Sequence, residues 1–251
     1  MKCRYEELAG MIDHALLHPT LTDSEIRVGC KMAAEYRVAS VCVKPYAVHF
    51  AREILRDSDV AVGTVIGFPH GSPEIAIKQA ETALACDEGA TEIDFVINIG
   101  KALSEDWGYI EKEVRAVSDE AHRHGALVKV IFETTFFPLD SSKVRLCRIS
   151  EDVGADFVKT STGFDFVKSA GGGFATVGAT EHDLRLMRAS CSPRVQVKAS
   201  GGVRNLDALL AVKALGATRC GTSATREILD EFRRRERGEG GIAVADAGGG
   251  Y

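Results

Sequence analysis

Short apolar runs alternate with longer stretches of helical periodicity along most of the chain. Apolar runs of four to eight residues that are rich in β-branched side chains are typical of buried parallel strands. Eight such runs lie at Met11–His14, Val38–Val43, Val60–Ile66, Thr91–Ile97, Leu127–Phe132, Asp156–Thr160, Val195–Ala199 and Ala217–Gly221. Helical patterns between them include Glu25–Tyr36, Pro73–Glu88, Glu105–His124 and Ser142–Val153. This alternation predicts βαβ units and a parallel sheet.

The ends of the predicted helices carry the expected residue types. Gly89, Gly125 and Gly154 each follow a helical stretch, and we expect Asp23 and Ser24 to cap the first one. Eight strand–helix units favour a closed (β/α)8 TIM barrel, an α/β fold. An open, Rossmann-like doubly wound sheet is the alternative.

The chain length fits a single barrel domain. It has 251 residues, and (β/α)8 barrels commonly have about 250. We expect the barrel to occupy residues 1–231. Residues 232–251 change from Arg/Glu-rich to Gly/Ala-rich sequence, which predicts a flexible C-terminal tail. The Gly-rich stretch Phe164–Gly178 follows a predicted strand and is a candidate mobile lid.

Composition narrows the class of protein. Hydrophobic residues make up 45% and charged residues 27%, as in globular proteins. A net charge of -5 predicts no nucleic-acid partner, since such binding needs clustered cations. No apolar stretch approaches the roughly 20 residues that span a bilayer, and the charged start lacks a signal-peptide core, so we expect a cytoplasmic protein. The seven cysteines form no CxxC pair, which predicts reduced thiols.

Four ionisable residues interrupt strands that are otherwise apolar: Asp94, Lys129, Lys159 and Lys198. Side chains alternate between the two faces of a strand, so each of these four residues points away from its apolar neighbours and into the predicted barrel. A buried ion-pair network of these lysines with Asp94 and Glu133 is one reading.

Imine chemistry is the other reading. An amine is nucleophilic only when it is unprotonated, and burial or a second cation lowers its pKa. A nearby carboxylate can then move the protons that imine formation requires. Two or three converging lysines with one aspartate therefore predict attack on a carbonyl substrate.

Small residues follow the last predicted strands, at Ser161–Gly163, Ser200–Arg204 and Gly221–Ala224. Backbone N–H groups in such loops can hold a phosphate, and barrels often bind phosphate after strands seven and eight. For Gly201 and Gly202 alone, a simple tight turn is an equally good explanation.

Several longer motifs make the chain similar to a known family. They are Ile12–His14, Val41–Val43, Thr64–Gly71, Glu92–Gly100, Val128–Thr134, Phe157–Gly163, Val197–Gly202 and Gly221–Ser223. Their sequence and order, from about Ile12 to Ile228, resemble the 2-deoxyribose-5-phosphate aldolase family of class I, Schiff-base aldolases.

The resemblance implies specific roles. Lys159 would form the Schiff base, Lys198 would lower its pKa, and Asp94 would relay protons. The substrate and its phosphate would be bound by Asp13, Lys129, Thr160, Gly163, Gly201, Gly202, Gly221 and Ser223. The implied reaction is the reversible cleavage of 2-deoxy-D-ribose 5-phosphate to acetaldehyde and D-glyceraldehyde 3-phosphate, in deoxyribose phosphate catabolism. It needs no metal or organic cofactor, and a homodimer or higher homo-oligomer is expected.

The chain departs from the family pattern at four places. Ala15 stands where Thr is common, Lys44 where Asn is common, and Ala224 where Ser is frequent. The connection Asp165–Gly178 is longer than usual. These differences bear on substrate preference more than on imine formation.

Three other functions are compatible with parts of the sequence. A different lysine-type aldolase could act on another sugar phosphate, and a catalytically silent barrel could bind one and signal. A metal-dependent aldolase would need histidine ligands, but His14, His18, His49 and His70 show no ligand spacing. His122 and His124 lie two apart on a helix and so do not face one another.

Overall fold

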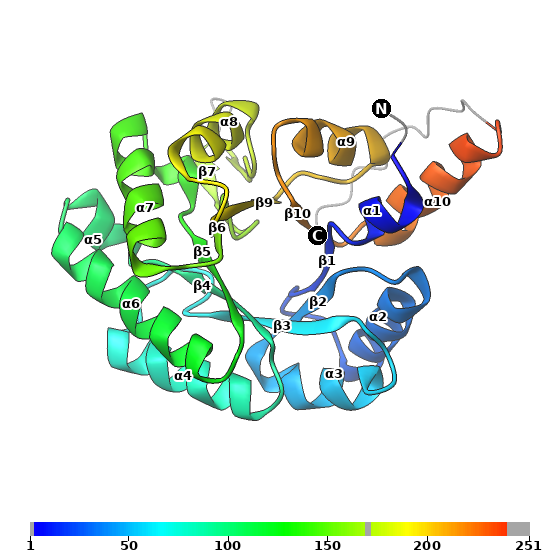
Figure 1. Cartoon of the computed structure of the whole chain (residues 1–251), viewed down its shortest axis with the longest axis horizontal. Coiled ribbons are helices and arrows are strands. Elements are labelled where there is room, and N and C mark those ends of the chain that lie inside the picture. Colours follow the sequence, from blue (N-terminus) through cyan, green and yellow to red (C-terminus); the bar gives the residue numbers. More distant parts are fainter. Residues whose placement is uncertain (1–2, 169–171, 240–251) are drawn as a thin grey trace.

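A closed barrel of eight parallel strands forms the centre of the computed structural model, which describes residues 3–168 and 172–239. The helices surround these strands (Figure 1). Around the barrel the strands follow the order β1 (Ile12–Leu16), β10 (Arg219–Thr222), β9 (Gln196–Ser200), β6 (Phe157–Lys159), β5 (Leu127–Ile131), β4 (Glu92–Val96), β3 (Ala61–Ile66) and β2 (Ser40–Val43). The predicted TIM barrel is confirmed, and the open sheet is wrong.

The four predicted helices are present. The α-helices are α1 (Tyr5–Ala9), α2 (Asp23–Tyr36), α3 (Val48–Leu55), α4 (Ile75–Asp87), α5 (Ile99–Leu103), α6 (Trp107–Arg123), α7 (Asp140–Val153), α8 (Glu181–Ser190), α9 (Leu206–Ala214) and α10 (Thr225–Glu236). Two short 3-10 helices cover Pro45–Ala47 and Thr134–Phe136.

The cap of α2 differs from the expected one. Thr22, not Asp23 or Ser24, is the N-cap, because its hydroxyl accepts from the Glu25 backbone N–H while the Glu25 carboxylate accepts from the Thr22 N–H at 2.8 Å. This reciprocal capping box places Asp23 in the first turn.

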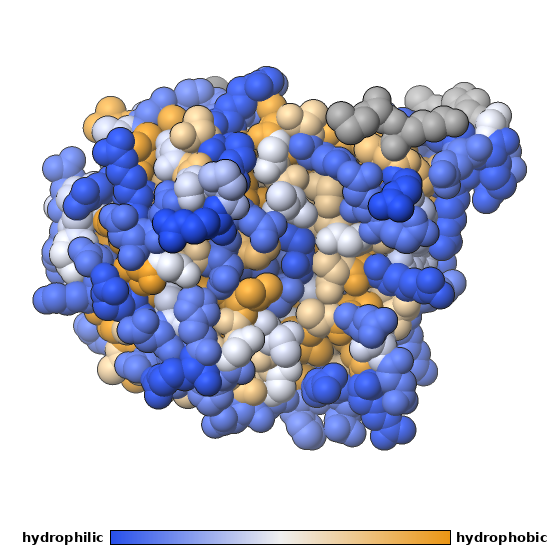
Figure 2. Space-filling view, viewed as in Figure 1, coloured by the Kyte–Doolittle hydropathy of each residue, from blue (hydrophilic) through white to orange (hydrophobic). Residues whose placement is uncertain are grey.

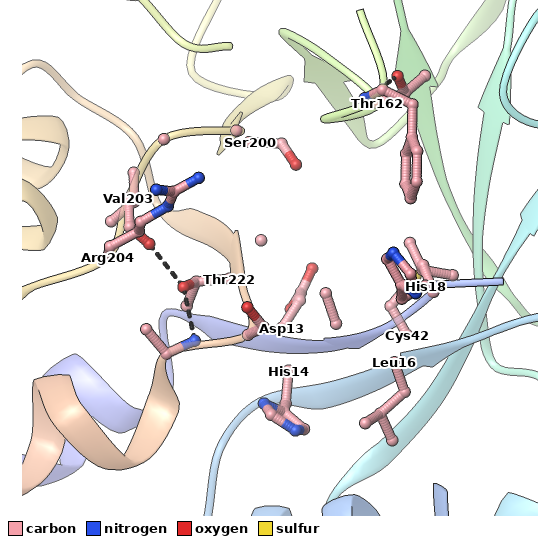
Figure 3. A pocket seen from close by; sticks show the side chains of 18 of the residues that line it. Asp13, His14, Leu16, His18, Cys42, Thr162, Ser200, Val203, Arg204 and Thr222 are labelled. Carbon is pink, nitrogen blue, oxygen red and sulfur yellow. Dashed lines mark hydrogen bonds between the residues drawn. The ribbon is translucent and has the colours of Figure 1, made fainter. Parts of the chain in front are cut away.

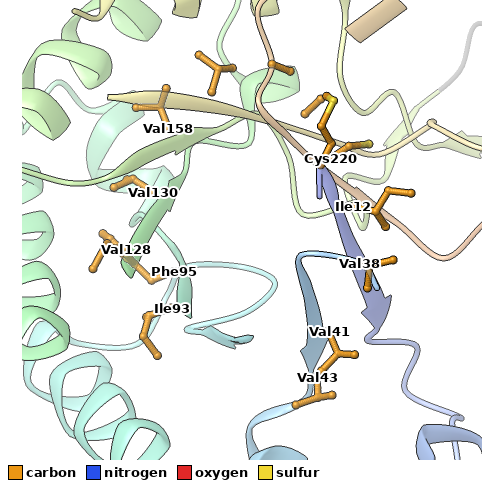
Figure 4. Close-up of a cluster of buried hydrophobic side chains, with 14 of the residues drawn as sticks. Ile12, Val38, Val41, Val43, Ile93, Phe95, Val128, Val130, Val158 and Cys220 are labelled. Atoms are coloured by element: carbon orange, nitrogen blue, oxygen red, sulfur yellow. The ribbon is translucent and has the colours of Figure 1, made fainter. Parts of the chain in front are cut away.

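The outward-facing strand residues pack against the helices and form most of the core. Ile93, Phe95, Val128, Val130 and Val158 are each 0% exposed, and Figure 4 shows these side chains between strands and helices. Inward-facing positions alternate with them, and many of these are polar. In the space-filling view, hydrophilic residues cover most of the outer rim of the molecule (Figure 2).

The longer connection between β6 and α8 contains a small antiparallel pair outside the barrel. Its strands are β7 (Val167–Lys168) and β8 (Phe174–Ala175). Residues 169–171 of the candidate lid lie outside the described residues.

The last helix continues past the domain boundary expected at residue 231. Phe232 is 8% exposed, and the Tyr36 hydroxyl donates to Asp230 at 2.9 Å, so this part of α10 packs on the barrel. Residues 240–251 of the expected tail lie outside the described residues. Within residues 3–168 and 172–239, none of the helices is long and apolar enough to cross a bilayer.

A buried ion pair joins α4 to α6 away from the barrel interior. Lys78 Nζ lies 2.6 Å from Glu113 Oε1, and both side chains are 0% exposed. Lys78 also donates to the carbonyl oxygens of Gly71 and Val96, each at 2.7 Å. Glu113 Oε2 accepts from the Asn98 N–H at 2.7 Å. The pair thus fixes the loops that follow β3 and β4.

We expect Glu113→Ala to destabilise the fold by about 3–5 kcal/mol, because it leaves the Lys78 charge buried without a partner. Urea unfolding monitored by circular dichroism measures this change. Glu111→Ala is the control on the same helix, since Glu111 forms an exposed pair with Arg115 and should contribute less than about 1 kcal/mol. Equal small losses in both variants would show that the buried pair contributes little.

Candidate active site

One carboxylate at the centre of the barrel is shared by three lysines. Asp94 Oδ2 accepts from Lys159 Nζ at 2.8 Å and from Lys198 Nζ at 2.7 Å. Asp94 Oδ1 accepts from Lys129 Nζ at 2.8 Å. The parallel register explains the meeting, because Asp94 pairs with Lys129 across β4 and β5, and Lys159 with Lys198 across β6 and β9. All four side chains are buried.

Two more carboxylates, Asp13 and Glu92, belong to this network. Asp13 pairs with Lys198 and, at 3.3 Å, with Lys129. Glu92 accepts from Lys129 at 2.6 Å and from Arg219 at 2.7 Å. Arg219 also pairs with Asp13. When all seven groups are ionised, the three buried lysines and the partly buried Arg219 therefore exceed the three carboxylates by one positive charge.

The three lysines do not hold their protons equally tightly. Burial opposes charge on Lys198 and Lys129, yet the carboxylates of Asp13 and Asp94 hold both pKa values above the ordinary lysine value. Burial lowers the pKa of Lys159, and the Lys198 charge lowers it further, against the opposing effect of Asp94. Lys159 is thus the lysine of this network that gives up its proton most readily.

A cavity of about 570 Å³ opens above the network at the carboxyl ends of the strands. Lys159, Lys198 and Asp13 lie on its wall, together with the loops that follow β1, β6, β9 and β10. Figure 3 shows Asp13, Cys42, Thr162 and Ser200 around this space. Burial raises the pKa of the Cys42 thiol to about 11, so this cysteine stays protonated at neutral pH.

The loops at one end of the cavity are tied to each other. The Thr222 hydroxyl donates to the Val203 carbonyl at 2.6 Å and accepts from the Ala224 N–H at 3.0 Å, as drawn in Figure 3. Gly201 and Gly202 have φ of 86° and 83°, a left-handed conformation that glycine adopts without strain. The cavity wall here combines backbone with the Arg204 side chain.

Some of the candidate site residues line the cavity and others do not. Lys159, Lys198, Asp13, Gly201, Gly202, Gly221 and Ser223 line the cavity. Lys129, Thr160 and Gly163 do not belong to its lining, and Asp94 lies directly beneath the two lining lysines. Lys129 is held by the carboxylates of Asp13, Glu92 and Asp94. The Thr160 hydroxyl donates to the Ser200 carbonyl at 3.2 Å.

Sequence reasoning missed Arg219 and Glu92. The signal was present for Glu92, because it lies two residues before Asp94 and so faces the same side of β4. Arg219 lies beside Lys198 in the register of β9 and β10. Glu133, expected in the ion-pair reading, binds Thr162 instead.

The histidines are not arranged as metal ligands. His14 is buried, its Nδ1 lies 2.9 Å from the Thr225 hydroxyl, and burial lowers its pKa to about 4. In the part of the chain that the structure describes, no three His, Cys, Asp or Glu side chains are grouped to hold a metal ion.

Comparisons with known proteins agree with this geometry. Residues 8–231 match the model of the DeoC/LacD family aldolases. A deoxyribose-phosphate aldolase of Rhodopirellula baltica is 45% identical over 232 residues, covering 92% of each chain. Deoxyribose-phosphate aldolase 1 of Bacillus licheniformis is 47% identical over 219 residues, covering 87% of this chain and 93% of its own.

Solved aldolase structures are also similar to this barrel. The tetrameric deoxyribose phosphate aldolase of Aeropyrum pernix superposes with a TM-score of 0.82 at 30% identity, covering 92% of each chain. The aldolase QR15 superposes with a TM-score of 0.83 at 35% identity, covering 92% of this chain and 98% of its own. The chain belongs to the DeoC/LacD family of aldolases. It is an aldolase, and its barrel is that of the deoxyribose-phosphate aldolases.

One departure from the family pattern has a structural role in this aldolase. Lys44 Nζ donates to the carbonyl oxygens of His18 and Leu21, each at 3.1 Å, and so holds the loop that follows β1. His18 and Leu21 are part of the cavity wall. Ala15 also lines the cavity and offers no hydroxyl there.

A second buried carboxyl supports the loop after Lys159 in the aldolase. Glu133 adopts a left-handed conformation with φ of 60°, which is strained for a residue with a side chain. Its carboxyl accepts from the Thr162 N–H at 3.1 Å and from the Thr162 hydroxyl. Burial raises the pKa of Glu133 to about 7 against these hydrogen bonds, and Asp165 raises it further.

The raised pKa of Glu133 predicts a pH-dependent stability. The folded aldolase holds this proton more tightly than the unfolded chain, so the stabilising contribution is complete below pH 4.5 and is lost as pH rises to about 7. The loss amounts to about 3 kcal/mol. Glu133→Gln cannot titrate, so wild type should lose unfolding free energy relative to this variant over that interval. A pH-independent difference between the two denaturation series would contradict the raised pKa.

Proposed function

We propose that this aldolase reversibly cleaves 2-deoxy-D-ribose 5-phosphate to D-glyceraldehyde 3-phosphate and acetaldehyde through a Schiff base on Lys159. The observation that carries the proposal is the position of the Lys159 amine. It lies on the wall of the cavity, 2.8 Å from Asp94, and burial and the Lys198 charge lower its pKa. A lowered pKa gives a lysine a larger fraction of the free amine, which is the nucleophilic form.

The first half of the reaction forms the imine. The free amine of Lys159 adds to the C1 aldehyde of the open-chain sugar and gives a carbinolamine. Loss of water, after protonation of the carbinolamine oxygen, leaves a protonated Schiff base. Asp94 accepts hydrogen bonds from both Lys159 and Lys198, so it lies within reach to pass the proton.

The second half breaks the C2–C3 bond. The C3 hydroxyl loses its proton, the electron pair of the bond moves into the iminium, and glyceraldehyde 3-phosphate leaves as the aldehyde. The enamine that remains on Lys159 takes a proton at C2. Water then hydrolyses the resulting iminium, which releases acetaldehyde and restores the free amine. Lys198, held charged by Asp13 and Asp94, adds to burial in lowering the pKa of Lys159 and so favours its free amine between turnovers.

The loops after β9 and β10 would hold the phosphate end of the substrate. Gly201, Gly202, Gly221 and Ser223 line the same end of the cavity as the Arg204 side chain. Ser223 is followed by Ala224, the N-cap of α10, and the N-terminus of a helix attracts anions. The relatives named as deoxyribose-phosphate aldolases favour this substrate over another sugar phosphate.

Chemical trapping of the imine tests whether Lys159 is the nucleophile. With acetaldehyde and sodium borohydride, we expect an ethyl group to attach to Lys159, because reduction fixes the imine as a secondary amine. Peptide mass spectrometry locates the modification. Lys159→Ala should lose both the label and the turnover of 2-deoxyribose 5-phosphate. Full labelling of that variant at another lysine would refute the assignment. Labelling of Lys159 with no turnover of this sugar phosphate would favour another lysine-type aldolase.

The charge of Lys198 should set the pH dependence of the reaction. Activity needs the free amine of Lys159 and therefore rises with pH through its pKa. Lys198→Leu removes the neighbouring cation, so the pKa of Lys159 rises and the acid limb of kcat/KM moves to higher pH. At neutral pH we expect a loss of about a hundredfold or more. An unchanged pH profile, with the fold intact by circular dichroism, would contradict this role.

A further inference from the structure

The connection between β6 and α8 is closed by a buried aspartate at its beginning. Asp165 follows the loop of Lys159 and is 0% exposed. Its Oδ2 atom accepts from the backbone N–H groups of Val177 at 3.0 Å and Gly178 at 3.1 Å. One carboxylate oxygen therefore joins the two ends of the segment that carries β7 and β8.

The same oxygen ties this segment to the neighbouring loop of the barrel. The Thr135 hydroxyl, from the 3-10 helix that follows β5, donates to Asp165 Oδ2 at 2.8 Å. Three donors from two connections thus converge on a single atom. Because Asp165 is buried, water cannot replace these donors, and their positions are fixed relative to the barrel.

The far end of the segment, at Gly178, is in close contact with Gly201 in the loop that follows β9. A Cβ atom built on Gly178 would lie 2.6 Å from the Gly201 carbonyl carbon, and one built on Gly201 would lie 2.7 Å from Gly178 Cα. The Ala179 N–H donates to the Gly201 carbonyl at 3.2 Å. This approach is possible only between glycines, and Gly201 lines the cavity.

We propose that Asp165 is a positioning residue that sets the affinity of the aldolase for the phosphate of its substrate, by holding Gly178 against Gly201. The inference rests on the proposed phosphate end of the cavity. Without the carboxylate, residues 177–179 lose their anchor and the backbone N–H groups of the Gly201–Gly202 turn are no longer preorganised. The two lysines lie within β6 and β9, before these loops begin, and their contacts with Asp94 involve none of residues 165, 177 and 178.

A purely structural role would have a different signature. If Asp165 only stabilised the fold, its removal would lower the melting temperature and reduce kcat/KM equally for phosphorylated and unphosphorylated substrates. A positioning role would instead affect the phosphorylated substrate more than the unphosphorylated one. Binding energy that the phosphate supplies in both ground state and transition state appears in KM, while kcat for the bound sugar stays close to wild type.

The experiment compares Asp165→Ala, Asp165→Asn and Phe166→Ser with wild type. Asn keeps an oxygen that can accept all three hydrogen bonds. Phe166 is the adjacent residue and is 61% exposed, so its change controls for altering the segment itself. Each protein is assayed for cleavage of 2-deoxyribose 5-phosphate and of free 2-deoxyribose. Calorimetry with inorganic phosphate measures anion binding independently of turnover.

We expect Asp165→Ala to raise KM for the phosphorylated sugar and Kd for inorganic phosphate by about tenfold, the effect of one lost hydrogen bond to a charged group. Its kcat/KM for free 2-deoxyribose should stay within about twofold of wild type. Asp165→Asn and Phe166→Ser should behave as wild type toward both sugars. Equal losses on both sugars, or an Asn variant as impaired as the Ala variant, would overturn the proposal.

Two further outcomes are informative. If Asp165→Ala does not fold, Thr135→Val removes one of the three donors and should raise Kd for phosphate to a smaller degree; an unchanged Kd would overturn the proposal. If wild type binds inorganic phosphate but does not cleave the sugar phosphate, the proposed reaction fails, while the phosphate titrations still decide the role of Asp165. Wild type without measurable phosphate binding would refute the positioning role itself.

Discussion

The constraint on which the site depends is the sharing of one buried carboxylate, Asp94, among three lysine side chains. A buried carboxylate normally pairs with one cation, and a buried lysine without a partner loses its proton. Here Lys129 and Lys198 have additional carboxylates in Glu92 and Asp13. Lys159 has only Asp94 among the described side chains. The competition for Asp94 therefore leaves Lys159 as the group that is most easily deprotonated.

The barrel makes this competition possible. Strands in a closed parallel sheet bring inward side chains from β4, β5, β6 and β9 together in the barrel interior, where these four side chains are buried. Outward residues of the same strands pack on the helices and keep the wall rigid. The loops beyond the strand ends can then vary without disturbing the ionic network. The extended β6–α8 connection and Lys44 are two such variations, and both bear on the cavity wall rather than on the lysines.

Sequence periodicity was sufficient for the barrel and for the inward lysines, because both follow from alternation along each strand. It could not assign partners, since these depend on the register between strands. Lys129, expected to bind substrate, lies among carboxylates below the cavity, and Arg219 entered the network unpredicted. The contacts of Asp165 could not be predicted from sequence either, because its three donors come from segments that are far apart in sequence or irregular in structure. The cap of α2 was misplaced by one residue for a local reason, the reciprocal bonds of Thr22 and Glu25.

The central claim concerns the protonation state of one amine, which can be measured without any substrate. Titration of 15N-labelled lysine side chains by NMR, with the Lys159 signal assigned from its loss in Lys159→Met, reports the pKa directly. A value clearly below 10.5, with Lys198 titrating above it, is what this charge distribution predicts. A Lys159 pKa at or above that of Lys198 would mean that Asp94 protects the proton of Lys159, and the account of the nucleophile would be wrong.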